Sequence, residues 1–149
     1  MDDTRRLRGS DGGYFLEDLS VGMCASYART VTEADIVLFA GISGDHNPIH
    51  MDERYAAKTH FGGRIVHGML SASFLSTAIA SKLPGPGTIY LKQNLTFRAP
   101  VRIGDTVEAQ VTVMDIIREK ARVVLKTVCQ VDDTVVIDGD ALVMVPARS

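Results

Sequence analysis

The segment SGDHNPIH, Ser43 to His50, holds an aspartate, two of the chain's four histidines and an asparagine around one proline. Asp45 and His50 are five positions apart across an Asn-Pro turn. In a loop that folds back, such a carboxylate and imidazole can share one water, take a proton from it and return a proton elsewhere. The alternative is a plain turn, in which Asp45 and Asn47 bond their own backbone and His50 fills a gap.

The other polar residues of this segment have different expected roles. Asn47 is expected to fix the loop and not to react. His46 should point elsewhere if Asp45 and His50 converge, so no direct role is assigned to it. No metal is predicted, because Pro48 prevents the helical i, i+4 geometry that would place His46 and His50 on one face.

A second candidate site lies in IVHGMLSAS, where a helix is expected to begin near Gly68. The first N–H groups of a helix lack intrahelical partners and carry the positive end of its dipole, so they suit a carbonyl that becomes enolate-like. The alternative is that Gly68 only lets the helix enter tightly against a sheet and that His67 caps it. Ser76, two helical turns further on, is expected to bond a ligand or to bond back to the carbonyl of residue 72.

Helical segments must position both candidate sites. Thr32, with Asp35 three residues on, predicts the capped start of a helix that Gly41 and Gly44 would end. Residues 45–50 should then form a tight loop and not a helical turn, because Pro48 disfavours helix at the residue before it. MDERYAAKT predicts a short helix capped by Asp52, and MLSASFLSTAIASKL predicts a helix that is apolar on nearly every side and therefore buried.

The pattern changes to strands in the remainder of the chain. CASYART follows a turn at Val21-Gly22, and from Thr88 onward the sequence alternates as strands do, with turns at Gly104-Asp105 and Asp132-Asp133. Long strands with short connections predict an antiparallel sheet, and the apolar helix is its natural cover. The predicted fold is α+β: a curved antiparallel sheet wrapped around a central buried helix.

The bulk properties fit one ordinary globular domain. With 149 residues, the chain is expected to have a flexible N-terminal arm at residues 1–13 and a single domain at residues 14–149. A net charge of −2 predicts no nucleic-acid or anionic-membrane partner, and no run is apolar enough to span a bilayer. Cys24 and Cys129 are predicted to be buried reduced thiols, and no secretory signal opens the chain, so a cytoplasmic location is expected.

Three motifs together resemble a known family. SGDHNPIH, GRIVHGMLSASFLS and PGPGTIYLKQNLTFRAPVRIGDTV are similar to the R-specific enoyl-CoA hydratases, the MaoC-like dehydratase group of hydratase 2 type. The similarity runs from about Ser20 to the C-terminus. It implies a hot-dog fold, a homodimer or higher homo-oligomer with active sites near the interface, and no cofactor beyond the CoA or phosphopantetheine that the substrate carries.

The resemblance also implies roles for individual residues. Asp45 and His50 would activate the water that adds to a trans-2-enoyl thioester, the backbone amide of Gly68 would bind the thioester carbonyl, and Ser76 would support the site. The product would be an (R)-3-hydroxyacyl-CoA, formed reversibly. One departure is His46, since close relatives often have an aromatic or apolar residue there.

Three rival functions are kept beside the hydratase. The first is a 3-hydroxyacyl-acyl-carrier-protein dehydratase, because CoA and acyl carrier protein present the same phosphopantetheine arm. The second is a hot-dog thioesterase, against which the aspartate–histidine pair argues. The third is a non-catalytic acyl-thioester binding module, in which that pair would be inert.

Overall fold

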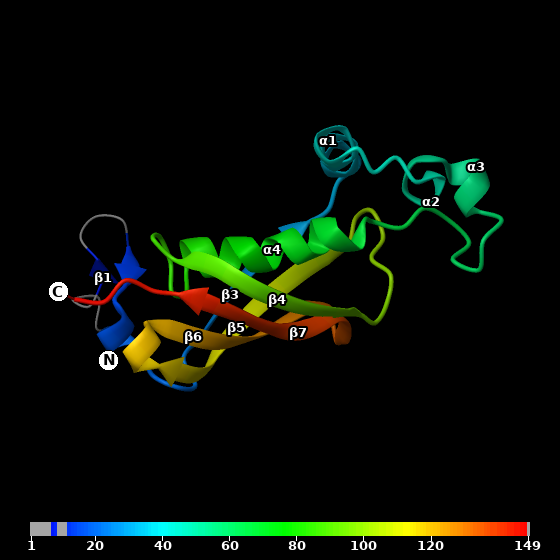
Figure 1. Cartoon of the computed structure of the whole chain (residues 1–149). Coiled ribbons are helices and arrows are strands. Elements are labelled where there is room, and N and C mark those ends of the chain that lie inside the picture. Colours follow the sequence, from blue (N-terminus) through cyan, green and yellow to red (C-terminus); the bar gives the residue numbers. More distant parts are fainter. Residues whose placement is uncertain (1–6, 9–11, 149) are drawn as a thin grey trace.

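A five-stranded antiparallel sheet forms the body of the molecule (Figure 1). The computed structural model describes residues 7–8 and 12–148. The strand order is β3-β5-β6-β7-β4, with bounds β3 Cys24–Thr30, β4 Ile89–Phe97, β5 Thr106–Ile117, β6 Arg122–Val131 and β7 Thr134–Met144. Irregular register in three of the strand pairs adds local bends, which help the sheet to curve.

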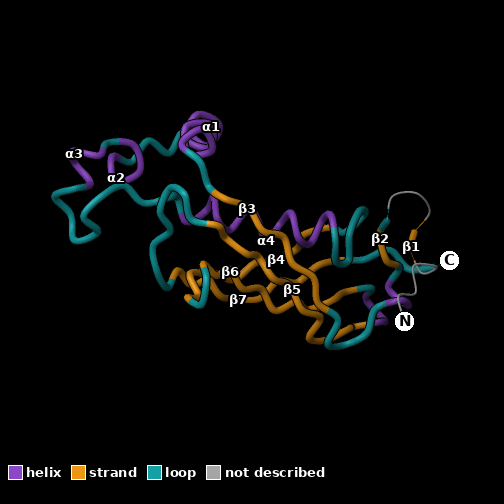
Figure 2. The backbone as a smooth tube through the Cα atoms, turned by 180° about the vertical axis from the view of Figure 1, so that it is seen from behind, coloured by secondary structure: helices purple, strands orange, loops and turns teal. Residues whose placement is uncertain are grey.

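The long helix α4 (Gly68–Ser81) lies along one face of this sheet (Figures 1 and 2). Its buried side chains, among them Leu70, Leu75 and Ile79, pack against the inward-facing residues of the strands. Alternate residues of β5 and β6 are buried, because only one face of each strand meets the helix. The predicted α+β fold, a hot-dog arrangement of sheet and central helix, is confirmed.

The remaining elements lie beyond the two ends of the sheet (Figure 1). At one end are α1 (Glu33–Ser43), α2 (Pro48–Met51) and α3 (Glu53–Ala56). At the other end are the short strands β1 (Leu7–Arg8) and β2 (Gly13–Tyr14), the 3-10 helix η3 (Leu16–Asp18) and the C-terminal residues. A second 3-10 helix, η4 (Arg118–Lys120), joins β5 to β6. The segment from α1 to α3 thus overhangs one end of the sheet.

The predicted helix caps are confirmed. Thr32 Oγ1 accepts a hydrogen bond from the Asp35 amide at 3.3 Å, and Asp35 Oδ2 accepts one from the Thr32 amide at 2.9 Å. Gly44 ends α1 with a φ of 80°, whereas Gly41 lies within the helix. Asp52 caps α3, since its Oδ1 accepts from two amides of the first turn.

The sequence predicted a loop without a helical turn over residues 45–50, and this prediction is wrong for residues 48–50. Pro48 is the first residue of α2, and Asn47 is its N-cap, with Oδ1 accepting from the Ile49 amide at 3.2 Å. Proline is favoured at this position because the missing N–H would have no partner there. His50 therefore lies on a helical turn, while Asp45 lies in the loop before it.

The two cysteines differ in environment. Cys129 is buried, and its burial raises the pKa of the thiol to about 12. Cys24 is exposed at the start of the edge strand β3, so the prediction that both thiols are buried is wrong for this residue.

Two further expectations concern the ends of the chain and the membrane. Of residues 1–13, the structure describes 7–8 and 12–13, and Leu7–Arg8 pair with Gly13–Tyr14. The other residues of the predicted flexible arm lie outside the described part, so the arm stays a prediction.

Within residues 7–8 and 12–148, no helix has the length and apolar character needed to cross a membrane.

Candidate active site

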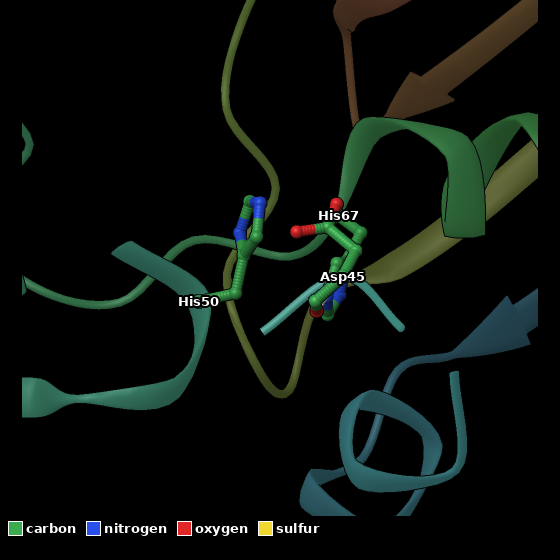
Figure 3. A group of neighbouring side chains, drawn as sticks. All are labelled: Asp45, His50 and His67. Carbon is green, nitrogen blue, oxygen red and sulfur yellow. Dashed lines mark hydrogen bonds between the residues drawn. The ribbon is translucent and has the colours of Figure 1, made fainter. Parts of the chain in front are cut away.

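Asp45, His50 and His67 converge where the overhanging segment meets α4 (Figure 3). Asp45 follows the end of α1, His50 lies on α2, and His67 directly precedes α4. One carboxylate oxygen and one ring nitrogen from each histidine lie within 4.8 Å of one another. The fold therefore brings together the predicted pair and adds a second histidine.

The His50 ring is oriented by a backbone carbonyl. Its Nδ1 lies 2.8 Å from the carbonyl oxygen of Ile65. Because a carbonyl can only accept, Nδ1 carries the proton, and the neutral ring keeps its lone pair on Nε2. The residue is 9% exposed, so Nε2 is presented from a ring that is held by its surroundings.

Asp45 is held through its backbone and lies at the exposed side of the site. Its amide donates to Ser43 Oγ at 3.1 Å, and its carboxylate accepts from the Asn47 amide at 3.2 Å. Its carbonyl oxygen lies 3.0 Å from His67 Nε2. Asn47 thus contacts both ends of the turn, as backbone donor to Asp45 and as cap of α2.

His67 is the buried member of the group, and sequence reasoning considered it only as a cap. Its ring lies between those of Phe39 and His50, with centroids 4.8 Å and 4.1 Å away. It is 1% exposed, and burial is the main cause that lowers its pKa below the usual 6.5. His67 occupies the N-cap position of α4, as the cap interpretation expected, but its side chain makes no capping bond to the helix.

The tautomer of His67 follows from the hydrogen bond of its ring nitrogen Nε2. Nε2 must donate to the Asp45 carbonyl, and the neutral ring therefore leaves Nδ1 as an acceptor. Among the residues that the structure describes, no protein group bonds this buried Nδ1. His67 is therefore a neutral donor that fixes the backbone of Asp45.

A cavity of about 460 Å³ opens beside these residues. Its walls come from the segment that precedes α4, the start of α4, the end of β4 and the residues that follow it, and Ile137 of β7. Most of the lining is apolar, and it includes Phe61, Ile65, Met69, Phe97, Ala99 and Val101. The cavity suits an apolar chain whose polar end meets Asp45 and His50.

Gly68 lines the same cavity as the first residue of α4. Its amide has no intrahelical acceptor and stands at the positive end of the helix dipole. A Cβ at this position would lie 2.6 Å from Cε1 of Phe97, well inside contact distance. Both interpretations of Gly68 are thus compatible with the structure: an accessible donor, and a close approach of the helix to β4.

Ser76 and His46 lie apart from the cavity. Ser76 is half-buried on α4 and does not belong to the described cavity lining, so its supporting role stays a prediction. Ser71 does line the cavity, and its buried Oγ has no hydrogen-bond partner within the described part of the chain. His46 is exposed, and its Nδ1 donates to the Gly44 carbonyl at 3.2 Å.

Asp45, His50 and His67 are also of the residue types that bind transition metals. One nitrogen of each ring is already engaged with a backbone carbonyl, Nδ1 in His50 and Nε2 in His67. The expectation that the site works without a metal stays a prediction.

The sheet, the buried helix and the cavity beside them place the chain in the hot-dog class of α+β domains. Within this class, the chain belongs to the family of MaoC-like domains, whose model matches residues 22–135. The (R)-specific enoyl-CoA hydratase of Rhodospirillum rubrum is 55% identical over 135 residues, which are 91% of this chain and 94% of that protein.

Two further comparisons agree with this assignment. The 3-hydroxybutyryl-CoA dehydratase of Methylorubrum extorquens is 48% identical, over 90% of this chain and 85% of its own. The structure of the unliganded R-hydratase PhaJ1 from Pseudomonas aeruginosa aligns with a TM-score of 0.84 and 45% identity, and covers 89% of this chain and 86% of its own.

Proposed function

We propose that the protein catalyses the reversible hydration of trans-2-enoyl-CoA to (R)-3-hydroxyacyl-CoA. The observation that carries the proposal is the pairing of the Asp45 carboxylate with the His50 ring, within 4.8 Å, beside an apolar cavity. The names of the two curated relatives, a hydratase and a dehydratase, describe the two directions of this reaction.

Water activation follows from the positions of the two groups. A single water can bond both, because each hydrogen bond spans about 2.8 Å and the pair lies within 4.8 Å. The water oxygen forms a bond to C3 of the enoyl group while one of its protons passes to the pair. A proton from the pair is delivered to C2, so one water is consumed and the pair is regenerated. The two groups interact closely, and base and acid are therefore roles of the pair.

The negative charge that develops on the thioester oxygen needs donors. The Gly68 amide at the start of α4 supplies one, with the helix dipole behind it. The donor is already in place before the reaction, so no reorganisation is needed as the charge grows. In this proposal Ser76 and Asn47 have supporting positions, Ser76 on α4 and Asn47 in the turn that holds Asp45.

CoA is the proposed carrier, and no cofactor is required beyond it. The Rhodospirillum rubrum and Methylorubrum extorquens relatives, at 55% and 48% identity, both have CoA in their names, which supports CoA over acyl carrier protein. The rival carrier-protein dehydratase would use the same residues for the same chemistry. The cytoplasmic location stays a prediction.

A homodimer is proposed on the basis of the edge strand β4. Both β3 and β4 are edges of the sheet, but only β4 exposes large apolar side chains, namely Ile89, Tyr90, Leu91 and Phe97. An unpaired edge with such side chains is a template for a second strand. Pairing of β4 with β4 of a second copy would bury them and extend the sheet across both subunits.

The hydratase proposal is tested with Asp45→Asn and His50→Ala. Each should lower the hydration of crotonyl-CoA by about 10²- to 10⁴-fold, because each removes one half of the proton-transfer pair. The loss of enoyl absorbance gives the rate, and circular dichroism checks the fold. His46→Ala is the matched control, since this exposed histidine bonds only its own loop, and it should keep normal turnover.

The same assay separates the rival functions. Release of free CoA, followed with a thiol reagent, would favour the thioesterase. Tight binding of acyl-CoA without turnover at any chain length would favour the binding module. Near-normal hydration by either Asp45→Asn or His50→Ala would overturn the assignment of the site.

A further inference from the structure

The carbonyl that orients His50 belongs to the connector between α3 and α4, residues 57–67. The position of this connector against α2 therefore decides how the His50 ring is held. Arg64, next to Ile65 in the connector, has a side chain that is only 14% exposed. We propose that Arg64, tied to Glu33, is a positioning residue that holds His50 in one tautomer and one orientation.

Arg64 contacts two other elements with one side chain. Its Nε donates to the carbonyl oxygen of His50 at 2.5 Å. Its Nη1 and Nη2 donate to the two carboxylate oxygens of Glu33, at 2.8 Å and 3.1 Å. Glu33 is the first residue of α1, so a two-pronged ion pair links α1 to the connector while the third nitrogen fixes α2.

The neighbouring bonds show why this contact matters for the ring. The Ile65 amide donates to the Ile49 carbonyl at 3.2 Å, and the Ile65 carbonyl accepts from His50 Nδ1 at 2.8 Å. Together with Arg64 Nε, these bonds join residues 49–50 to residues 64–65 through both backbone and ring. Without the Arg64 side chain, the backbone of His50 loses its own tie to the connector, and between residues 49–50 and residues 64–65 the backbone bond of the Ile65 amide is the one that still supports the ring bond.

A lysine cannot replace Arg64 in this arrangement. The guanidinium donates along fixed directions from three nitrogens, whereas an ammonium is a single point on a flexible stem. The lysine ammonium can bond either the Glu33 carboxylate or the His50 carbonyl, but it does not hold these two groups in fixed positions relative to each other. The requirement is thus for the planar fork and not for a positive charge alone.

The stabilising effect of the ion pair itself is small. Glu33 has a side chain that is 56% exposed, and exposed pairs contribute little to folding. Neither Glu33 nor Arg64 belongs to the described cavity lining. Loss of the pair should therefore affect the reacting step more than folding or substrate binding.

The inference rests on the proposed hydratase function, but one of its tests does not. In protein labelled with ¹⁵N-histidine, the His50 ring should show a single tautomer with the proton on Nδ1. His50→Ala identifies the signals. In Arg64→Gln and Arg64→Lys, the ring should populate both tautomers, because its bond to Ile65 is no longer enforced. This readout needs no substrate.

The kinetic test uses Arg64→Gln, Glu33→Gln and the double variant. Arg64→Gln should lower kcat by about 10- to 100-fold, as loss of a partner that orients a functional histidine does, with KM nearly unchanged. Glu33→Gln should give a smaller loss in the same direction. In the Arg64→Gln background, Glu33→Gln should have no further effect, since Glu33 acts through Arg64.

Arg29→Gln is the matched control. Arg29 pairs with Asp35 at 2.7 Å, also in the first turn of α1, without a bond to α2 or to the connector. This variant should keep normal kcat and a single His50 tautomer. If Arg29→Gln lowers kcat as much as Arg64→Gln does, the loss of kcat arises from any disturbance of α1, and the inference is wrong.

The remaining outcomes separate the inference from the function on which it rests. Full kcat and one tautomer in folded Arg64→Gln would overturn the inference alone. Full activity in Asp45→Asn or His50→Ala would overturn the function, while the tautomer of His50 would still report on Arg64. If Arg64→Gln does not fold, Glu33→Gln decides, and unchanged kcat and tautomer there would contradict the proposal.

Discussion

At the scale of single residues, burial separates the two histidines of the site. His67 is enclosed by the rings of Phe39 and His50, and water cannot solvate its charged form. Its ring contacts the Asp45 carbonyl through Nε2, which is the donor. His67 is thus a neutral structural donor, whereas His50 is the histidine that takes part in proton transfer in the proposed function.

The lowered pKa of His67 predicts a pH-dependent stability. In the unfolded chain His67 binds a proton near pH 6.5, whereas the folded protein binds it only at lower pH. Its contribution to stability is therefore complete above pH 6.5 and is lost as the pH falls through the pKa of the folded protein. His67→Gln keeps a donor without titrating, so its melting temperature should fall less than that of the wild type between pH 7.5 and pH 5.

Thermal unfolding at several pH values checks this expectation. His46→Gln serves as control, because His46 is exposed on the same loop region. The groups that face His67 are Asp45, His50 and His46, and none is changed in His67→Gln. An unaltered pH dependence in His67→Gln would show that the acid sensitivity arises elsewhere.

The sequence predicted that Asp45 and His50 would lie together but not the contacts of His67 and Arg64, and the reason is physical. An acid and a histidine around a proline form a local pattern that is visible in a single segment. Nε2 of His67 and Nε of Arg64 contact backbone carbonyls of residues that are 22 and 14 positions away. Every residue has such a carbonyl, so no residue type marks the partner.

At the scale of elements, features that depend on neighbouring residues were likewise predictable, whereas features that depend on distant segments were not. The caps at Thr32 and Asp52 depend on bonds within one turn, and they were predictable. The start of α2 at Pro48 was not, because proline is compatible with both a loop and the first turn of a helix. The close approach of Phe97 to Gly68 depends on how β4 meets α4, which no local pattern contains.

The close approach of the Phe97 ring to Gly68 leads to a prediction for Gly68→Ala. The new methyl group would lie 2.6 Å from the Phe97 ring, so the ring must move, and it lines the cavity. We expect a loss of about 1–3 kcal/mol in stability, as for other overpacked sites, together with lower kcat/KM. Chemical denaturation and the crotonyl-CoA assay measure the two effects.

The double variant Gly68→Ala, Phe97→Leu shows whether the Phe97 ring causes the loss of stability in Gly68→Ala. The double variant should regain part of the lost stability, since the smaller leucine side chain leaves room for the new methyl group. Activity should recover in parallel, because alanine retains the amide at the start of α4. A Gly68→Ala variant that is as stable and active as the wild type would mean that Phe97 moves freely.

At the scale of the whole molecule, the architecture followed from periodicity. Alternation in residues 88–144 and the apolar helix were enough to predict the sheet and its cover, because one buried face requires the other. The position of β3 beside β5, at the edge opposite to β4, could not be predicted. Strand order depends on pairings between distant segments, which the alternation of each strand does not specify.

The proposed dimer predicts the effect of a charge on the β4 edge. Leu91→Asp places a carboxylate among the exposed apolar side chains of this strand, where two copies would meet. Sedimentation velocity should show a dimer for the wild type and a shift towards monomer for the variant. The matched change Ala28→Asp, at an exposed position of the opposite edge strand β3, should leave the dimer intact. A monomeric wild type would contradict the proposal.

The overhang at one end of the sheet carries Asp45 and His50, whereas part of the cavity wall lies outside it. Asp45, His50 and the residues that hold them lie between α1 and α4, whereas Phe97, Ala99, Val101 and Ile137 of the cavity wall belong to the sheet and the chain leaving it. Substitutions in the wall can therefore change which acyl chains fit, without moving the proton-transfer groups. In the proposed function, substitutions at Ala99, Val101 and Ile137 should alter the preferred acyl chain more than the rate of the chemical step.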